Sequence, residues 1–545
     1  MAKEINIDLI PKEKLVLANQ GDRIKDQKFE DKPIGYFKDA WRRFCKNKAS
    51  IVAAVIILMI VVFAIVLPFF NTGTGTDFDT RYAKKGPRNL FLSQFGIATG
   101  DVEKDMNERG FIYEIAKGIG AEYVGEDITL GQAIANGDYL QPVTSVNAIE
   151  QVQQGKELNN IYYADVDEYL SVGFIYLQVS QEEYQKMVDW ENTEGNPQLL
   201  YPLIDIKDED SSGKNYCFDT TDANCWYKTD KTGQPVYTYK TKSGKVKDEV
   251  IEYNAVGEIV LEENYMRYGK GHSKEGELRY YKPHGGGTTA ETAEYQVRVL
   301  YYNYYQYMHD GAEPEFIFGT DVSGYDLAQR IAMGLRLSLL FSVCIFAINF
   351  VLGAMYGAIE GYYGGTCDLI MEFVAYVLSG VPFVVVSTLF QIHLAAKVGP
   401  IPSLLFAFVM TGWIGTASLV RTQFYRFKNQ EYVMAARTLG AKDMRIIWKH
   451  IFPNTLGTII TSSVLAIPGV IFSESMLTYL GIVNLNSQTS TSLGTILAQA
   501  ESIWSTKPHV MLFPALFLSL LMICFNLFGN GLRDAFNPSL RGTED

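Results

Sequence analysis

Cysteine is scarce in this sequence, and no cysteine spacing typical of a metal or redox centre occurs. The 545 residues include six cysteines, with no CxxC pair and no zinc-like Cys/His pattern. Cys344 and Cys524 lie in apolar runs, where a buried packing role is expected. Cys217 and Cys225 are close neighbours in an acidic region, and they can form one disulfide if that region lies outside the cell. The sequence therefore predicts no metal site and leaves the disulfide open.

The lack of a phosphate-binding loop and the scarcity of basic residues in one region exclude two classes of function. No GxxxxGK[ST] phosphate loop is present, so we do not expect this chain to hydrolyse ATP. Basic residues are scarce over residues 71–334, which carry 43 Asp and Glu against 24 Lys and Arg. Phosphate backbones attract Lys and Arg, so the acidic part is not expected to bind nucleic acid. The remainder is net basic, which indicates a polar acidic domain joined to a basic, largely apolar one.

Long apolar runs lie on both sides of the acidic region. The first, Ser50–Phe70, starts too late and is too long for a signal peptide, so a retained membrane helix is predicted. Five more runs are each long enough to cross a hydrocarbon core about 30 Å thick. They cover approximately Leu335–Ile359, Leu369–Leu394, Pro400–Val420, Leu456–Leu480 and His509–Phe528. The predicted fold is a polytopic α-helical membrane protein with six transmembrane helices.

The distribution of Lys and Arg predicts the orientation of these helices. Basic residues gather before the first run, between the fourth and fifth runs, and after the last run. With six crossings these three segments fall on one side, which the positive-inside rule identifies as cytoplasmic. The short acidic loop Glu360–Asp368 is an exception. Both termini are therefore expected in the cytoplasm, and the acidic region outside the cell.

The large segment between the first and second runs is predicted to be a folded domain. It is rich in tyrosine, as in YYNYYQY at Tyr301–Tyr307, and it contains strand-like alternations such as VYTYKTK. We expect a mixed α/β domain, in which the tyrosines either pack in the core or bind a ligand. The expected division of the chain is 1–49 (cytoplasmic segment), 50–70 (first helix), 71–318 (inserted extracellular domain), 319–532 (membrane core, including a cytoplasmic segment at 421–455) and 533–545 (cytoplasmic tail).

The segment EYVMAARTLGAKDMRIIWKHIFPN, Glu431–Asn454, is a basic amphipathic stretch between two apolar runs. Gly440 permits a turn in its middle, and Pro453 is expected to end its second helix. Helical spacing relates two sets of apolar residues on either side of the glycine. These sets are Tyr432, Ala435, Ala436 and Leu439, then Met444, Ile447, Trp448 and Ile451. The prediction is two short helices joined at a glycine, which either dock on a partner or lie on lipid headgroups.

Ionisable residues inside apolar runs are energetically costly and therefore suggest a function. Glu474 lies deep in the fifth run between Ser473 and Ser475, and Glu372 lies near the start of the third. Glu474 either makes a hydrogen bond between helices or belongs to a translocation pathway or gate, with Ser473 and Glu372 as further candidates. Pro382 and Pro468, within the third and fifth runs, are each expected to bend their helix.

The stretch AARTLG, followed by HIFPN, resembles the cytoplasmic coupling motif of ATP-binding-cassette importer permeases. Ala435, Ala436, Gly440 and Pro453 match at the family spacing, whereas Met434 stands where the family has Glu. Three other stretches resemble the C-type subunit of oligopeptide and dipeptide permeases. They are FGTDVSGYDLAQRIAMGLRLSLL (318–340), SESMLTYLGI (473–482) and NLFGNGLRDAFNPSLR (526–541). In the stretch SESMLTYLGI, Glu474 aligns with a Glu that is usual in that subunit. The resemblance covers the first helix and residues 316–541, but not the inserted domain.

This resemblance implies a type I importer core in a bacterial cytoplasmic membrane. The chain would be one of two unlike permease subunits, the other being a B-type subunit. Two ATPase subunits would bind ATP and Mg, and an extracytoplasmic peptide-binding lipoprotein would deliver the peptide. This chain would bind no cofactor and catalyse no reaction. The residues implied in coupling to the ATPase are Glu431, Ala435, Ala436, Arg437, Gly440, Ala441, Asp443 and Pro453. The apolar face that spacing gives to Met444, Ile447, Trp448 and Ile451 would pack back onto the membrane helices.

Two other functions fit parts of the sequence. The same machine importing another solute, such as a nickel chelate or a sugar, is compatible with the helices. A membrane-anchored sensor explains a large external domain but not four separate family-like stretches. For the inserted domain three roles stay open: a docking platform for the binding protein, a gate over the outer mouth, or a peptide-binding module in its own right.

Overall fold

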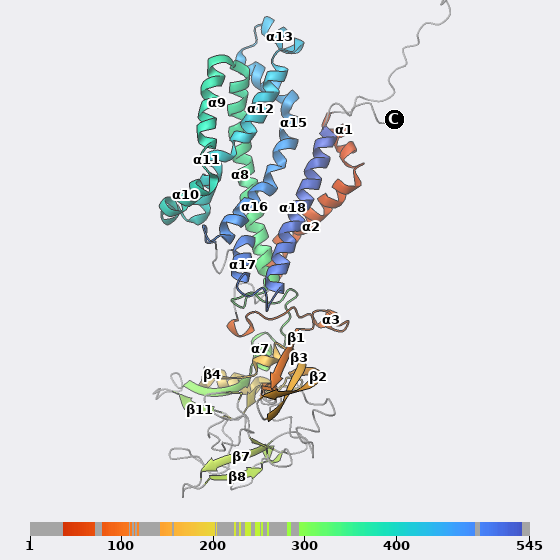
Figure 1. The fold of residues 1–545 in the computed structure, drawn as a ribbon, viewed down its shortest axis with the longest axis vertical. Coiled ribbons are helices and arrows are strands. Elements are labelled where there is room, and N and C mark those ends of the chain that lie inside the picture. Colours follow the sequence, from red (N-terminus) through yellow and green to blue (C-terminus); the bar gives the residue numbers. More distant parts are fainter. Residues whose placement is uncertain are drawn as a thin grey trace, which may run out of the picture.

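A bundle of long helices and a head of short strands meet end to end in the computed structural model of this protein (Figure 1). The head is formed by the segment between α2 (Lys48–Phe70) and α8 (Leu327–Tyr363). The structure describes residues 36–70, 79–107, 110–111, 114, 117–118, 142–154, 157–201, 203, 223–224, 228–229, 235–240, 246–250, 252–253, 259–260, 281–284, 294–485 and 491–536.

Five helices in the described part of the chain are long and apolar enough to cross a membrane. They are α2, α8, the pair α11 (Pro400–Gly412) and α12 (Ile414–Phe427), the stretch Asp443–Tyr479, and α18 (His509–Phe536). A sixth candidate is a pair of helices bent by 73°, α9 (Gly365–Ser379) and α10 (Phe383–Val398). Two short helices, α1 (Tyr36–Phe44) and α17 (Leu493–Ala500), precede α2 and α18. The helices therefore fit a polytopic membrane protein.

Several helices differ from the bounds expected from hydropathy, and α8 and the third run differ most clearly. α8 begins well before its apolar run, at Leu327, because the Asp326 side chain accepts a hydrogen bond from the Ala328 amide (2.9 Å) and caps the helix. The third expected run, Leu369–Leu394, is not one straight helix. It breaks at Pro382, which has no amide hydrogen to donate and stands at the N-cap of α10. The bend expected at this proline is present. Pro468, by contrast, lies in the first turn of α16 (Ala466–Tyr479) and does not interrupt the long apolar stretch Asp443–Tyr479.

Three glycines spaced four residues apart let α8 and α12 pack backbone to backbone. Gly353, Gly357 and Gly361 all contact α12. A Cβ at Gly357 would overlap the carbonyl oxygen of Ala417, and one at Gly361 would lie 2.8 Å from the carbonyl oxygen of Arg421. Small residues at this spacing allow close helix packing in membranes. This contact holds α12, and the segment that follows it, against α8.

The described residues of the head form four small antiparallel sheets and a few short helices. β3 (Glu157–Asp167) pairs with β1 (Asp101–Asn107) and β2 (Val143–Gln154). β12 (Glu294–Leu300) pairs with β4 (Phe174–Ser180), β5 (Leu200–Tyr201) and β11 (Tyr281–His284). β7 (Pro235–Lys240) pairs with β6 (Lys228–Thr229) and β8 (Val246–Val250), and β9 (Glu252–Tyr253) pairs with β10 (Ile259–Val260). The helices are α3 (Leu90–Ser93), α6 (Gln181–Glu191) and α7 (Tyr301–Met308).

Tyrosines build much of the core of the head. The stretch YYNYYQY forms most of α7, whose Tyr301, Tyr302 and Tyr305 are buried in one cluster with Tyr82 and Tyr169. The ring centroid of Tyr82 lies 5.2 Å from that of Tyr169 and 5.1 Å from that of Tyr301, and both pairs meet edge to face. Burial raises the pKa of Tyr82 and Tyr169 well above their usual range. These tyrosines are packing residues.

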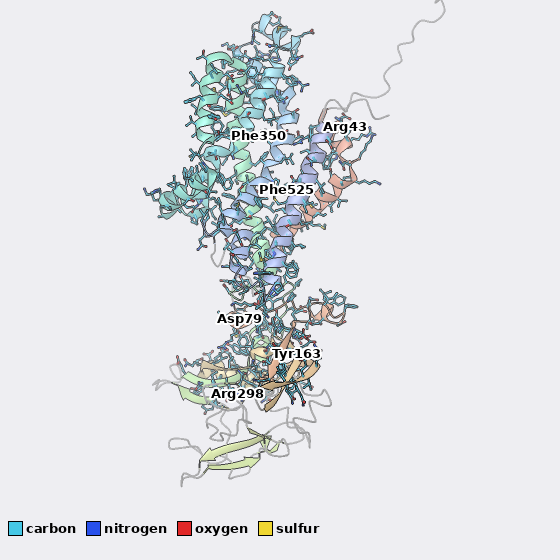
Figure 2. All side chains as sticks on the ribbon, in the orientation of Figure 1. Arg43, Asp79, Tyr163, Arg298, Phe350 and Phe525 are labelled. Carbon is cyan, nitrogen blue, oxygen red and sulfur yellow. The ribbon has the colours of Figure 1, made fainter. Side chains whose placement is uncertain are left out.

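The head is attached to the helix bundle by more than its chain connections. Asp79 lies where the two parts meet (Figure 2), and its amide donates a hydrogen bond to the Gly324 carbonyl (3.2 Å) just before α8. Glu168, directly after β3, forms an ion pair with Lys507, which precedes α18. The head is therefore held against the first turns of both helices.

Candidate functional site

Helix α13 (Glu431–Thr438) lies at the end of the bundle farthest from the head (Figure 1). Two hydrogen bonds close its C-terminus: the Gly440 amide donates to the Arg437 carbonyl (3.0 Å), and the Ala441 amide donates to the Ala436 carbonyl (3.1 Å). This pattern is a Schellman motif, in which the first residue past the cap adopts a left-handed conformation. Gly440 has a φ of +82° and open space around it. The backbone angle, and not crowding, therefore favours glycine here.

Apolar side chains around this turn are exposed. Leu439 is 88% exposed, Met444 60% and Met434 52%. Met444 therefore does not pack inward as its spacing predicts. We call the exposed apolar side chains of this region the coupling tip; they are Tyr432, Met434, Ala435, Leu439 and Met444. Exposed apolar patches of this kind are typical of surfaces that contact another protein.

The other side chains of α13 divide between interior and solvent. Ala436 is buried together with Val433, whereas Tyr432, Ala435 and Leu439 point outward, so the single apolar face predicted for the helix is split. Glu431 stands in the first turn, where a negative charge stabilises the helix dipole. One side of α13, with Val433 and Ala436, therefore packs against the bundle. The other side, with Tyr432, Ala435 and Leu439, is exposed.

The second half of the segment is not a separate short helix. α14 (Asp443–Arg445), a π-helical turn (Ile446–Ile451) and α15 (Phe452–Val464) follow one another and lead into α16 (Ala466–Tyr479). The prediction that Pro453 ends the helix is therefore wrong. Pro453 lies in the first turn of α15, directly after the π-helical turn, where its missing amide hydrogen is tolerated. Ile447 and Ile451 are buried, as their spacing predicts.

Tyr362, at the end of α8, joins both halves of the segment. Its hydroxyl donates a hydrogen bond to Asp443 Oδ1 (2.6 Å) and accepts one from Arg437 Nη2 (3.3 Å). The guanidinium carbon of Arg437 also lies 5.8 Å from the centre of the Tyr362 ring. The ring itself is buried in an apolar cluster with Ile446 and Ile447. Through this one side chain, α8 holds α13 and α14.

Arg421, on α12, is surrounded by three carboxylates from α8 and α9. Its Nε lies 2.6 Å from Asp368 and 3.3 Å from Glu360, and its Nη1 lies 3.2 Å from Glu372. The contact with Asp368 is bidentate, since Nη2 donates to the second carboxylate oxygen at 2.9 Å. The cluster ties three helices together at the same end of α8 as Tyr362. Glu372 is placed in this ion cluster.

Glu474 is fully buried where α8, α16 and α17 meet. Its Oε2 accepts a hydrogen bond from the Ser338 hydroxyl of α8 (2.8 Å). One turn further along α16, Thr478 accepts a hydrogen bond from Ser492, the N-cap residue of α17 (3.1 Å). The side chain therefore links two helices within a network of hydroxyl groups.

The candidate pathway residues are not gathered in one place. Ser338, the partner of Glu474, and Glu360, a neighbour of Glu372, are 22 residues apart on α8. That separation corresponds to about 33 Å along the helix axis. Ser473 is half-buried beside Glu474. The structure thus brings Ser473 and Glu474 together near the N-terminal third of α8. Glu372, on α9, lies beside the C-terminal end of α8.

The predicted disulfide pair, Cys217 and Cys225, lies outside the described residues. Cys524 is buried, as expected for its apolar run. Cys344 is exposed on α8, contrary to the packing role predicted for it, because hydropathy does not reveal which face of a helix is covered. Within the described ranges, no group of three or more His, Cys, Asp or Glu side chains is arranged to hold a metal ion.

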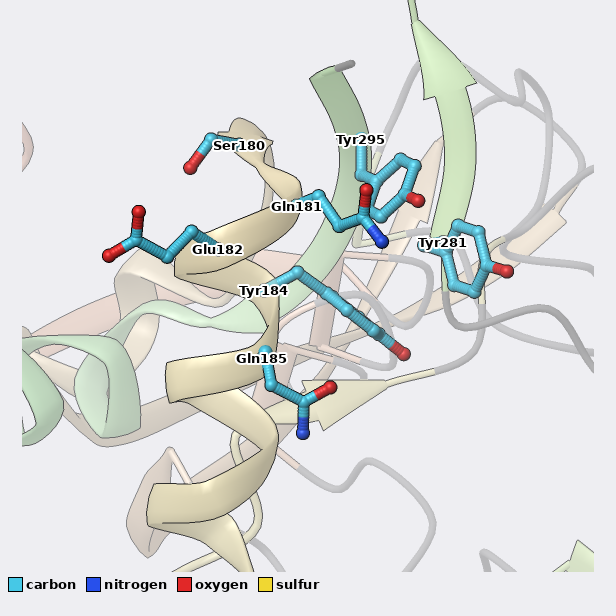
Figure 3. A pocket seen from close by; sticks show the side chains of 7 residues that line it. All are labelled: Ser180, Gln181, Glu182, Tyr184, Gln185, Tyr281 and Tyr295. Carbon is cyan, nitrogen blue, oxygen red and sulfur yellow. The ribbon is translucent and has the colours of Figure 1, made fainter. Parts of the chain in front are cut away.

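One cavity of about 640 Å³ lies on the head, between the first turns of α6 and the strands β11 and β12 (Figure 3). It is lined by Ser180, Gln181, Glu182, Tyr184, Gln185, Tyr281 and Tyr295. The rings of Tyr184, Tyr281 and Tyr295 lie 4.6–5.7 Å apart. Figure 3 shows Gln181 and Tyr184 pointing from α6 towards the other two tyrosines. These tyrosines, unlike those of the core, remain accessible to a ligand.

Sequence reasoning does not find Tyr362, Arg421 or Ser338, because a partner on a distant helix defines the role of each. The sequence does carry a sign of the close contact between α8 and α12. The four-residue spacing of Gly353, Gly357 and Gly361 is typical of close helix packing.

Comparisons with known proteins identify the family. Residues 349–542 match the model for the binding-protein-dependent transport system inner membrane component, and residues 35–87 match that for the N-terminal transmembrane domain of oligopeptide transport permease C. The dipeptide transport system permease protein DppC of Bacillus subtilis (strain 168) is 41% identical over 226 residues, which are 41% of this chain and 69% of the relative. This chain therefore belongs to the family of binding-protein-dependent transport permeases, in its OppC/DppC branch.

A second sequence relative agrees with this assignment. The oligopeptide transport system permease protein OppC of the same Bacillus subtilis strain is 38% identical over 224 residues, covering 41% of this chain and 72% of the relative. Among solved structures, a chain of the MetNI methionine ABC transporter in inward facing conformations aligns with this protein. The alignment covers 38% of this chain and 96% of the MetNI chain, with 15% identity and a TM-score of 0.33. The assignment rests on the sequence relatives. The two family models leave residues 88–348 unmatched, and most of the head lies in that interval.

Proposed function

We propose that this chain is one of two permease subunits of an ATP-driven importer of oligopeptides or dipeptides. Family membership carries this proposal, since the relatives with 38–41% identity are named as dipeptide and oligopeptide permeases. The chain forms half of the translocation pathway together with a B-type permease subunit. Two separate ATPase subunits bind ATP and Mg and drive transport, and an extracytoplasmic lipoprotein delivers the peptide.

The coupling tip supports a contact with an ATPase subunit. Its exposed apolar side chains suit a groove on another protein, and the small side chain of Ala435 lets the two backbones approach closely. Because α14 leads into α15 and α16, a displacement of the tip passes along a continuous stretch of helix. Tyr362 passes the same displacement to α8. Closure of the ATPase pair then switches access to the pathway by moving these helices as rigid bodies.

The head is assigned to the extracytoplasmic side, as an inserted mixed α/β domain. The basic residues around α13 support this orientation, because they lie at the end of the bundle opposite the head. The attachment of the head to α8 and α18 favours a docking platform or a gate over a peptide-binding module that acts independently of the helices. A partner that binds the head can then act directly on the outer ends of these helices.

Substitution of Gly440 by valine tests the coupling role. A β-branched residue strongly disfavours a φ of +82°, so the Schellman turn and the coupling tip are disturbed. We expect the complex to assemble and to hydrolyse ATP, while peptide uptake per ATP hydrolysed falls strongly. The control is Gly195→Val, which introduces the same strain at a φ of +98° in an open turn of the head and should leave this ratio unchanged. Unchanged uptake by Gly440→Val would contradict the coupling role.

A further inference from the structure

Arg336 differs from the other arginines that are buried or half-buried in the membrane-crossing helices. Arg330 is paired with Asp321 (Nε to Oδ2, 3.5 Å), and Arg421 is paired with three carboxylates. Among the residues that the structure describes, no hydrogen bond or ion pair engages the half-buried Arg336. A charge without a partner is costly inside an apolar helix, so such residues usually face a polar pathway or ligand.

Arg336 lines a cavity of about 350 Å³ between α8 and α11. The other residues that line it are Met333, Leu337, Leu340, Phe341, Cys344, Ile401 and Leu405. One cation therefore stands in an otherwise apolar wall. The volume is at the lower end of the range for ligand sites, enough for one or two residues of a peptide. Arg336 is nine residues after Leu327, roughly 14 Å from the head end of α8.

The chemistry of this wall matches a group that every unmodified peptide carries. A guanidinium binds a carboxylate through two parallel N–H···O bonds. When a peptide fills the cavity, the apolar surroundings exclude water from this pairing and strengthen it, and they fit an apolar side chain on the terminal residue. We propose that Arg336 binds the C-terminal carboxylate of the transported peptide in this cavity. The inference rests on the proposed function.

A carboxylate on the second permease subunit is the competing partner for Arg336. The shape of the site favours the peptide, since a single Asp or Glu side chain would leave most of the cavity unfilled. A peptide terminus supplies both the carboxylate and an apolar side chain.

The test compares uptake of one short peptide, ending either in a free carboxylate or in an amide, by the complete transporter. The permease chain is wild type, Arg336→Gln or Arg336→Lys. The preference of the delivering protein is the same in every case, so it cancels when the carboxylate-to-amide uptake ratios of two variants are compared. We expect Arg336→Gln to lower this ratio by roughly tenfold or more, since charge-assisted hydrogen bonds are lost. Arg336→Lys should lower it less, because the charge remains while the bidentate geometry is lost.

The control variant is Lys397→Gln, which removes an exposed positive charge at the end of α10 and should leave the ratio unchanged. An equal loss of uptake for both peptides in Arg336→Gln would overturn the proposal and assign Arg336 to a contact between subunits. An unchanged ratio would overturn it as well. If the wild-type transporter takes up neither peptide, the failure lies instead with the proposed function.

Cys344 provides a second measurement that needs no change at Arg336. It lines the same cavity about two turns along α8, and its side chain is exposed. In a transporter whose permease chain keeps only this cysteine, the free-carboxylate peptide should slow maleimide labelling of Cys344 more than the amidated peptide does. Equal labelling rates with either peptide would contradict the proposal even if Arg336→Gln fails to assemble.

Discussion

The Tyr362 hydroxyl donates a 2.6 Å hydrogen bond to the carboxylate of Asp443, a residue 81 positions later in the sequence. Arg437 completes the contact by donating to the same hydroxyl. The contact joins α8 to both sides of the turn at Gly440 and leaves the coupling tip uncovered. A firm attachment therefore lies directly beneath an exposed apolar surface. This arrangement supports the proposed role, in which a displacement of the tip by a partner passes to the bundle.

Replacing Tyr362 by phenylalanine removes this hydroxyl but keeps the buried ring. A hydrogen bond to a charged group contributes about 1.5–3 kcal/mol, and the exposure of Asp443 places this one at the lower end. We expect uptake per ATP hydrolysed to fall severalfold while the complex still assembles. Paired ATPase and uptake assays measure this. Tyr363→Phe is the control, because that neighbouring side chain is 53% exposed, and an equal effect of both variants would contradict the role of Tyr362.

A methyl group at Gly357 is expected to separate α8 from α12. Its Cβ would overlap the Ala417 carbonyl oxygen, and backbone atoms cannot move aside as a flexible side chain can. Overpacking of this kind destabilises by about 1–3 kcal/mol, so Gly357→Ala should lower the unfolding temperature in detergent. Gly415→Ala, on α12 with open space around it, should be neutral or stabilise by up to roughly 1 kcal/mol. Equal unfolding temperatures for the two variants would show that the close approach is unimportant.

Removing the cation of the ion cluster should destabilise the bundle. Arg421→Met leaves Glu360, Asp368 and Glu372 facing one another without a positive charge. Breaking a buried pair costs about 3–5 kcal/mol, and the 26% exposure of the Arg421 side chain reduces this to roughly 2 kcal/mol. Thermal unfolding measures the loss.

Two comparisons make the test of this cluster specific. Adding Asp368→Asn to Arg421→Met should restore part of the stability, because one of the unpaired charges is removed. Arg426→Met, which changes an exposed arginine on the same helix, should have little effect. If the double variant is less stable than Arg421→Met alone, the cluster does not act through charge.

The junction of the head predicts a pH dependence of stability. Burial lowers the pKa of Lys85 from 10.5 to about 8, although Glu168 opposes the shift. The folded chain then binds fewer protons than the unfolded chain between pH 8 and 10.5, so the contribution of Lys85 to stability rises with pH in this window. Tyr82 and Tyr169, with pKa values well above 10, act in the opposite sense: the unfolded chain loses their protons first, and stability falls above pH 10.

Thermal unfolding of the purified protein between pH 7 and 11 tests both effects. The unfolding temperature should rise from pH 8 towards pH 10 and decrease beyond it. Lys85→Met should remove the rise and raise the unfolding temperature at pH 7, since a half-buried charge is eliminated. Lys84→Met, at an exposed neighbouring position, should keep the wild-type profile. A rise that persists in Lys85→Met would exclude Lys85 as its cause.

Features that depend on consecutive residues could be predicted without a structure. Hydropathy sums over neighbours along the chain, so the apolar runs indicated a polytopic helical membrane protein. Pro382 marked a bend because the missing amide hydrogen is a property of the residue itself. The spacing around Gly440 located a helix end at a glycine, since a Schellman turn is built from adjacent residues.

Features that depend on residues far apart in the chain were decided by tertiary contacts. The prediction that Pro453 ends its helix fails for a local reason, since this proline lies in the first turn of α15, where a missing amide hydrogen is tolerated. Met444 and Cys344 are exposed although their local patterns suggested burial, since burial depends on what packs against a helix face. The partner of Tyr362, and the lack of a partner for Arg336 among the described residues, likewise follow from which helices meet. Charges and hydrogen bonds act over a few ångströms in space, and the order of residues along a chain does not specify those distances.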